Sequence, residues 1–282
     1  MYRIKRSWEL MKASIEVLKL DKELLLFPLI SSIMMIFIML TFLIPTLVGG
    51  VLDHILDTGM PVFGYFVLFL FYLVQYTVVY FNSTALVGAA IIRLRGGDPT
   101  VRDGYKIAGQ RILPILGWAL ISATVGLILK MLSNKSDERR WSIGNLIASI
   151  LGATWNVLTF LVVPVLAVEG LGPIEAIKRS WELLKRSWGE QISGTLSIGL
   201  IFTLIGIAGG MLLLDIGVGL TLWLKTSIPI IVCAALFLFF IMIVALLSST
   251  LNGIFSAAVY AYAADGQVGF FDESLIREAI NP

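Results

Sequence analysis

The sequence has little charge, one cysteine and one histidine. Only 14% of its 282 residues are charged, 58% are hydrophobic, and the formal net charge is +2. Such an apolar composition is typical of integral membrane proteins, and it excludes a disordered, collagen-like or coiled-coil chain. Because the net charge is small, the chain has no basic field to attract nucleic acid, and we expect no nucleic-acid partner.

The scarcity of cysteine and histidine also limits the chemistry. Cys233 has no partner for a disulfide within the chain, and with His54 it cannot supply the three or four ligands of a zinc site. A Ser-His-Asp arrangement is not available, because His54 falls in an expected loop beside two aspartates. We therefore predict no metal, no cofactor and no enzymatic activity.

Long runs without charge predict where the chain crosses a membrane. A bilayer core about 30 Å thick requires roughly 20 apolar helical residues. The sequence predicts six such helices, near residues 25–48, 62–91, 112–132, 143–167, 191–213 and 228–263. Asp53, Asp57, Lys130, Asp215 and Lys225 fall at the predicted edges, so no charged group is expected within a span. An ion-coupled transporter is disfavoured for that reason.

The distribution of Lys and Arg predicts the orientation. If both termini lie on one side, that side carries sixteen basic residues and the other side carries five. By the positive-inside rule, we expect a multi-pass protein of the cytoplasmic (inner) membrane with both termini on the cytoplasmic side.

An internal duplication is the strongest pattern in the sequence. Residues 4–14 and 177–187 agree at nine of eleven positions, and each copy lies just ahead of a predicted hairpin. A fainter copy begins near Val101. The pattern predicts an all-α fold in a single membrane domain, 1–282. Its six transmembrane helices form three hairpins, each preceded by a cytoplasmic amphipathic helix, in units of about 1–97, 98–170 and 171–266 with a tail at 267–282. Asp98-Pro99 and Gly172-Pro173 are expected to begin two of these amphipathic helices.

The amphipathic helices combine tryptophan with basic residues, as helices lying in a headgroup layer do. One interpretation is that they bind anionic lipid headgroups. The other, which we favour, is that they fix the depth and orientation of the hairpins. The candidate membrane-interface residues are Trp8, Lys12, Trp181, Lys185 and Trp188.

Polar clusters interrupt the second and sixth predicted helices about twenty residues from their starts. One hypothesis is that the clusters line a cavity that admits a lipid headgroup, and the simpler one is that they form helix–helix hydrogen bonds. The candidate cavity residues are Asn82, Ser83, Thr84, Ser248, Ser249, Thr250 and Asn252. Small residues at four-residue spacing predict close helix packing at Gly88, Gly253, Ala257 and Ala261.

The segment Val168–Lys185, with its Ala-Ile-Lys-Arg-Ser-Trp helix, and the opening Trp8–Pro28 resemble an uncharacterised family of prokaryotic six-helix membrane proteins. More distantly, the chain is similar to the membrane domain that precedes some glycerophosphodiester phosphodiesterases. The resemblance implies a helical inner-membrane protein. It implies no catalytic residues, because the soluble phosphodiesterase barrel is absent from this sequence.

The sequence thus leads to two expectations about function. The first is a non-enzymatic membrane protein that acts as a scaffold or a lipid-interacting partner, with possible protein partners or a homo-oligomer. The second is a carrier or flippase-like protein for a lipidic or uncharged substrate, which would use a cavity between the second and sixth helices.

Overall fold

The computed structural model describes residues 14–48, 62–134, 143–186 and 191–265. Within these ranges all regular structure is helical, and six helices are long and apolar enough to cross a membrane. This confirms the expected all-α class with six helices of spanning length. The candidate interface residues Trp8, Lys12 and Trp188 lie outside the described residues, as does nearly all of the first repeat copy.

Ten helices are labelled along the described chain. They are η1 (Lys22–Leu25), α2 (Leu26–Val48), α4 (Val62–Leu94), α5 (Val101–Gln110), α6 (Ile112–Asn134), α7 (Ile143–Leu158), α8 (Val162–Val168), α9 (Pro173–Arg186), α10 (Gln191–Leu224) and α11 (Ile228–Asp265).

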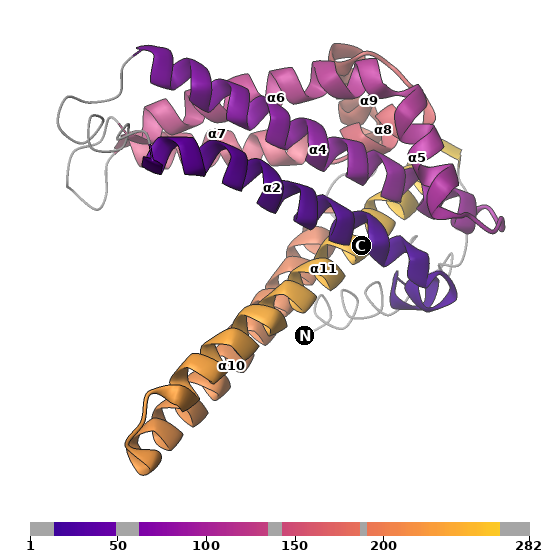
Figure 1. Ribbon diagram of the computed structural model, residues 1–282. Coiled ribbons are helices and arrows are strands. Elements are labelled where there is room, and N and C mark those ends of the chain that lie inside the picture. Colours follow the sequence, from indigo (N-terminus) through magenta and orange to yellow (C-terminus); the bar gives the residue numbers. More distant parts are fainter. Residues whose placement is uncertain (1–13, 49–61, 135–142, 187–190, 266–282) are drawn as a thin grey trace.

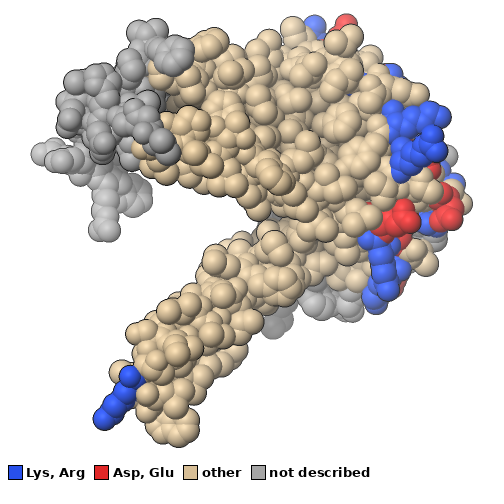
Figure 2. All heavy atoms as spheres, in the orientation of Figure 1, with Lys and Arg blue, Asp and Glu red and all other residues tan. Residues whose placement is uncertain are grey.

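The helices form two arms that meet at one end (Figure 1). In the four-helix arm, α2 packs along α4, α4 along α6, and α6 along α7. In the hairpin arm, α10 packs along α11 over most of its length. The arms join where the C-terminal part of α11 contacts α4, α2, α8 and α9. Beyond this junction they diverge, and the surface is hollowed between them (Figure 2).

Charged side chains gather at the junction of the arms, whereas the sides of both arms in this view are almost free of charge (Figure 2). We call this region the charged end, and its residues include Asp21, Arg93, Asp98, Glu169 and Arg179. The short helices α5 and α9 pack here, α5 mainly against α4 and α9 mainly against α8. The buried positions form one face of each helix. They include Gly104 and Ala108 in α5, and Ala176, Ser180 and Leu183 in α9.

Three helix boundaries differ from the prediction. The fourth predicted helix is broken at residues 159–161 into α7 and α8. Pro164 explains the break, because proline lacks an N–H and its ring conflicts with the carbonyl four residues earlier. Ser180 of α9 lies at the break, where its hydroxyl donates to the Leu158 carbonyl at 2.8 Å and accepts from the Leu161 N–H at 3.3 Å.

The fifth helix was predicted to end at residue 213, but α10 continues to Leu224. The prediction of no charge within a span is therefore wrong, because Asp215 lies inside the candidate span Gly199–Leu224. The helix continues past Asp215 because the residues on both sides are apolar and favour a helix in lipid. A single Asp in a helix costs less than about 1 kcal/mol relative to alanine.

The start of α5 also differs from the prediction. Asp98 was expected to cap this helix with Pro99 in its first position, but Thr100 caps it and Val101 is its first residue. Thr100 and Asp103 form a reciprocal capping box, which satisfies two backbone donors at once. Asp98 is instead paired with Arg93. The other expected start is confirmed, because α9 begins at Pro173.

Candidate functional site

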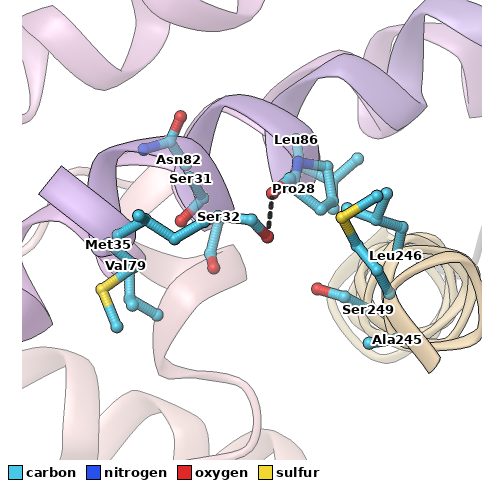
Figure 3. A pocket seen from close by; sticks show the side chains of 13 residues that line it. Pro28, Ser31, Ser32, Met35, Val79, Asn82, Leu86, Ala245, Leu246 and Ser249 are labelled. Atoms are coloured by element: carbon cyan, nitrogen blue, oxygen red, sulfur yellow. Dashed lines mark hydrogen bonds between the residues drawn. The ribbon is translucent and has the colours of Figure 1, made fainter. Parts of the chain in front are cut away.

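A pocket of about 440 Å³ lies where the two arms meet, between α2, α4 and α11 (Figure 3). Its volume is within the range of about 300–1,000 Å³ that is typical of ligand sites. Its lining residues are Pro28, Ser31, Ser32, Met35 and Ile36 of α2, Val79, Asn82, Ser83 and Leu86 of α4, and Met242, Ala245, Leu246 and Ser249 of α11. A largely apolar wall with a few polar groups suits a molecule that is itself largely apolar.

Each of the three helices contributes a serine with an unused hydroxyl. Ser31, Ser83 and Ser249 have no hydrogen-bond partner among the described residues, whereas the Ser32 hydroxyl donates to the Pro28 carbonyl of its own helix at 2.8 Å. Ser249 extends from α11 into the space that separates it from α2 (Figure 3). Three free hydroxyls can donate to, and accept from, a polar headgroup.

Asn82 is positioned by the protein itself. Its amide nitrogen donates to the Val78 carbonyl at 2.9 Å, and its amide oxygen accepts from the Tyr105 hydroxyl at 2.8 Å. Tyr105 belongs to α5 and packs edge-on against Phe27, and burial raises the pKa of its phenol. Asn82 therefore connects the pocket wall to the helix that leads into α6.

The other candidate cavity residues do not line this pocket. Thr84 and Thr250 are fully buried, and the Thr250 hydroxyl donates to the Leu246 carbonyl of its own helix. Ser248 lines a separate shallow groove between α10 and α11, and its carbonyl accepts from the Asn252 amide at 2.9 Å. The structure thus brings together Asn82, Ser83 and Ser249 and leaves the other four candidates elsewhere.

The small residues expected at helix contacts lie at two different contacts. A Cβ at Gly253 would meet the side chain of Leu86, so this glycine allows α11 to approach α4 closely. Ala257 and Ala261 are buried on the same helix. Gly88 faces α5 instead, because a Cβ there would lie 2.9 Å from Cδ1 of Ile107.

Two groups of ion pairs lie among the described residues of the charged end. In the first, the Arg93 Nε donates to Asp21 at 3.3 Å, and a second nitrogen pairs with Asp98. Burial raises the pKa of Asp21 above its ordinary value, and the nearby Arg93 partly opposes that effect. Glu23 adds a further link between these segments, because its carboxylate accepts from the Val101 N–H at 3.2 Å.

The second group joins three helical segments through Glu169, which directly follows α8. Its carboxylate accepts from the Arg179 Nε of α9 at 3.0 Å and from the Tyr260 hydroxyl of α11 at 2.9 Å. The hydrogen bond to Glu169 raises the pKa of Arg179 further. This group attaches the hairpin arm to the rest of the protein.

Trp181 and Lys185 are the candidate interface residues that the structure describes. The Lys185 ammonium lies 5.0 Å from the centre of the Trp181 ring, a cation–π distance. Lys185 is exposed and Trp181 is half-buried, so both lie at the edge of α9 and not on its buried face. Their contact with lipid headgroups stays a prediction.

Sequence reasoning missed the contribution of α2 to the pocket. The Ser31-Ser32 pair is the only pair of adjacent polar residues in α2, and this signal could have pointed to the pocket. The described residues contain no group of three or more His, Cys, Asp or Glu side chains that could hold a metal ion. The lining offers hydroxyls and an amide, which are suited to binding.

Comparison with known proteins gives one finding about relationship. A profile described as a family of unknown function, DUF6159, matches residues 62–270. The search of curated proteins returned no match, and no link to glycerophosphodiester phosphodiesterases is shown. The match covers α4 through α11, the part of the chain that holds two walls of the pocket and the whole hairpin arm. The chain therefore belongs to DUF6159, a family of unknown function.

Proposed function

We propose that this protein is a non-enzymatic integral membrane protein that binds a membrane lipid in the pocket between α2, α4 and α11. The observation that carries the proposal is that three hydroxyls with no partner in the described part of the chain, those of Ser31, Ser83 and Ser249, line a largely apolar pocket from three different helices. A lipid offers both halves of the required chemistry, a polar headgroup for the hydroxyls and an acyl chain for the apolar wall.

The position of the pocket also supports a lipid as the ligand. It lies at the junction of two arms whose sides are almost free of charge on the face shown in Figure 2, and the surface between the arms is hollowed there. In a bilayer, acyl chains would fill that space and lead directly to the pocket. The large exposed side chains along α10 and α11, such as Leu204 and Phe239, are compatible with contact to lipid.

We further propose that the charged end faces the cytoplasm at the cytoplasmic membrane, with both termini on that side. The excess of Lys and Arg on the expected inner side supports this orientation. Lys178 and Lys185 of α9 could interact there with anionic headgroups, which is the scaffold or lipid-partner role expected for these helices.

The proposal is tested by measuring co-purified lipid. The full-length protein, extracted in mild detergent, is analysed by native mass spectrometry beside the variants Ser31→Leu and Ser249→Leu, which place an isobutyl group in the pocket. We expect each variant to lose at least about four-fifths of the bound lipid, because the pocket is filled and a hydroxyl is removed. Thr41→Leu is the matched control, since Thr41 is exposed on α2 and does not line the pocket. Equal lipid in all four proteins would contradict the proposal.

A second candidate function is a carrier of a lipidic or uncharged substrate. The observation that favours it is the two-armed arrangement, in which the arms meet at one end and diverge beyond it (Figure 1). A rotation at that junction would move one arm relative to the other. Protein in liposomes that contain a headgroup-labelled lipid would distinguish the two roles. A carrier accelerates exchange of the label between leaflets, whereas a static lipid-binding protein does not.

A further inference from the structure

A single carboxylate lies deep in the apolar part of the hairpin arm. Asp215 is nine residues from the end of the candidate span Gly199–Leu224, or about 14 Å along the helix axis. In the six candidate spans it is the only charged residue more than three positions from a span end. An ionisable side chain at such a depth is unfavourable in lipid and usually has a function.

The tip of the arm indicates where the membrane boundary lies. Trp223 is 78% exposed at the end of α10, and Lys225 follows it in the turn to α11. Tryptophan and lysine are the residues that anchor helix ends at a membrane interface. Asp215 is eight residues below Trp223, which puts it about 12 Å along the helix from that boundary.

Asp215 points away from α11. Gly210 and Gly217 form the face of α10 that touches α11, where added Cβ atoms would lie 2.8 Å from Phe237 and 3.0 Å from Cys233. Asp215 is two residues from Gly217, about 200° around the helix, so it lies on nearly the opposite side of α10 from this contact. Its side chain is exposed, and the described residues provide no hydrogen bond or ion pair to it.

The surface around this carboxylate is apolar, and one position on it, a glycine, has no side chain. It comprises Met211, Leu212, Asp215, Gly219 and Leu222, which we call the Asp215 face. The Met211, Leu212 and Leu222 side chains are more than half exposed, and a Cβ built on Gly219 would meet no atom within 4 Å. A glycine one turn from Asp215 allows another helix to approach closely.

We propose that the Asp215 face docks a transmembrane helix of another membrane protein, and that this helix carries Arg or Lys at the depth of Asp215. An opposite charge is the group that compensates a carboxylate in lipid, because water is absent there. A second copy of this chain would not provide one. If a twofold axis along the membrane normal related two copies, their Asp215 side chains would face each other. In addition, neither span of the hairpin arm contains Lys or Arg.

The test uses the full-length protein in liposomes and a synthetic partner of defined sequence. A fluorescence donor is attached at the tip through Thr226→Cys, in a Cys233→Ala background. The acceptor is placed at one end of a Leu/Ala transmembrane peptide about 24 residues long, enough to span the bilayer, with a single Arg about eight residues from that end. The reference peptide has Leu in place of Arg. Energy transfer is measured as a function of peptide-to-lipid ratio.

We expect the Arg peptide to associate about tenfold more tightly than the Leu peptide. The difference disappears in Asp215→Leu and in Asp215→Asn, whereas it persists in Ile216→Ala, the matched control, because Ile216 is an exposed residue of α10 outside the Asp215 face. Two results would overturn the proposal. One is equal association of the Arg and Leu peptides. The other is self-association of the chain without peptide that is abolished by Asp215→Leu, which would identify a second copy as the occupant.

Discussion

Tyr260 of α11 donates its hydroxyl to Oε1 of Glu169 at 2.9 Å, across 91 positions of sequence. The same carboxylate oxygen accepts from Arg179 of α9, so one acidic side chain holds three helical segments together at the charged end. The α10–α11 hairpin is thereby attached to the four-helix arm at a defined point.

Removing this attachment should destabilise the junction of the arms. In Tyr260→Phe the ring remains, and the hydroxyl with its hydrogen bond to a charged acceptor is lost, which typically costs about 1.5–3 kcal/mol. We expect a lower midpoint of thermal unfolding in detergent. The control is Tyr262→Phe, because the Tyr262 hydroxyl has no hydrogen bond to the described part of the chain. If the two variants unfold at the same temperature, the attachment contributes nothing.

The packing of α5 on the four-helix arm depends on one glycine. A Cβ at Gly104 would lie 2.5 Å from Cζ of Phe27 and 2.7 Å from the carbonyl oxygen of Ala85, and the backbone oxygen cannot move away easily. We expect Gly104→Ala to destabilise the protein by about 1–3 kcal/mol, as overpacking of a filled contact does.

The same helix provides the control for that variant. Gly109 is also in α5, and a Cβ there would meet no atom within 4 Å. Gly109→Ala should be neutral or stabilise by up to about 1 kcal/mol, because alanine restricts the unfolded chain more than glycine. Chemical denaturation in detergent would measure both, and equal effects of the two substitutions would contradict the packing argument.

The break between α7 and α8 should depend on Ser180. This buried hydroxyl donates to the Leu158 carbonyl and accepts from the Leu161 N–H. Because the helix is broken here, these two backbone groups lack their usual partners within a helix. We expect Ser180→Ala to cost about 1–3 kcal/mol, because it leaves these backbone groups unpaired. Thr124→Ala removes a hydroxyl from an exposed position of α6, and it should change the unfolding free energy by less than about 0.5 kcal/mol.

The start of α5 should respond to acid. Hydrogen bonds from the Thr100 side chain and backbone hold the pKa of Asp103 below its ordinary value of 3.8. Since the folded-state pKa is the lower one, this carboxylate contributes stability above the unfolded pKa, and the contribution is lost as the pH falls through the folded pKa.

We therefore expect the wild-type protein to lose thermal stability below about pH 4 more steeply than Asp103→Asn, which has no charge to titrate at this position. The comparison of unfolding midpoints between about pH 6 and pH 3 measures the difference. Parallel pH profiles for the two proteins would show that the capping box does not stabilise the folded state.

Some of the structure was predictable from local sequence because its cause is local. The apolar runs around Leu40, Leu70 and Phe239 predict helices of spanning length, since only a helix satisfies backbone groups in lipid. The break at residues 159–161 also has a local cause in Pro164, although the apolar run concealed it. The end of α10 was misplaced because Asp215 was treated as a boundary, whereas its neighbours continue the helix.

The candidate pocket was only partly predictable. Asn82, Ser83 and Ser249 were expected together, and they line the same pocket, but Ser31 of α2 joins them without having been expected. Helical periodicity identifies the residues that share a face of one helix, yet it does not say which other helix that face meets. Thr250 illustrates this limit, because it is only one residue from Ser249 but is buried and bonded to its own helix.

The sequence by itself determined that this protein is helical, apolar and built around six long helices, because backbone hydrogen bonding in lipid allows few alternatives for such runs. The tertiary structure decided how those helices divide into two arms, where the arms join, and which serines meet at the junction. These features depend on contacts between residues far apart in the chain, such as Tyr260 with Glu169 and Gly253 with Leu86, and no local pattern specifies them.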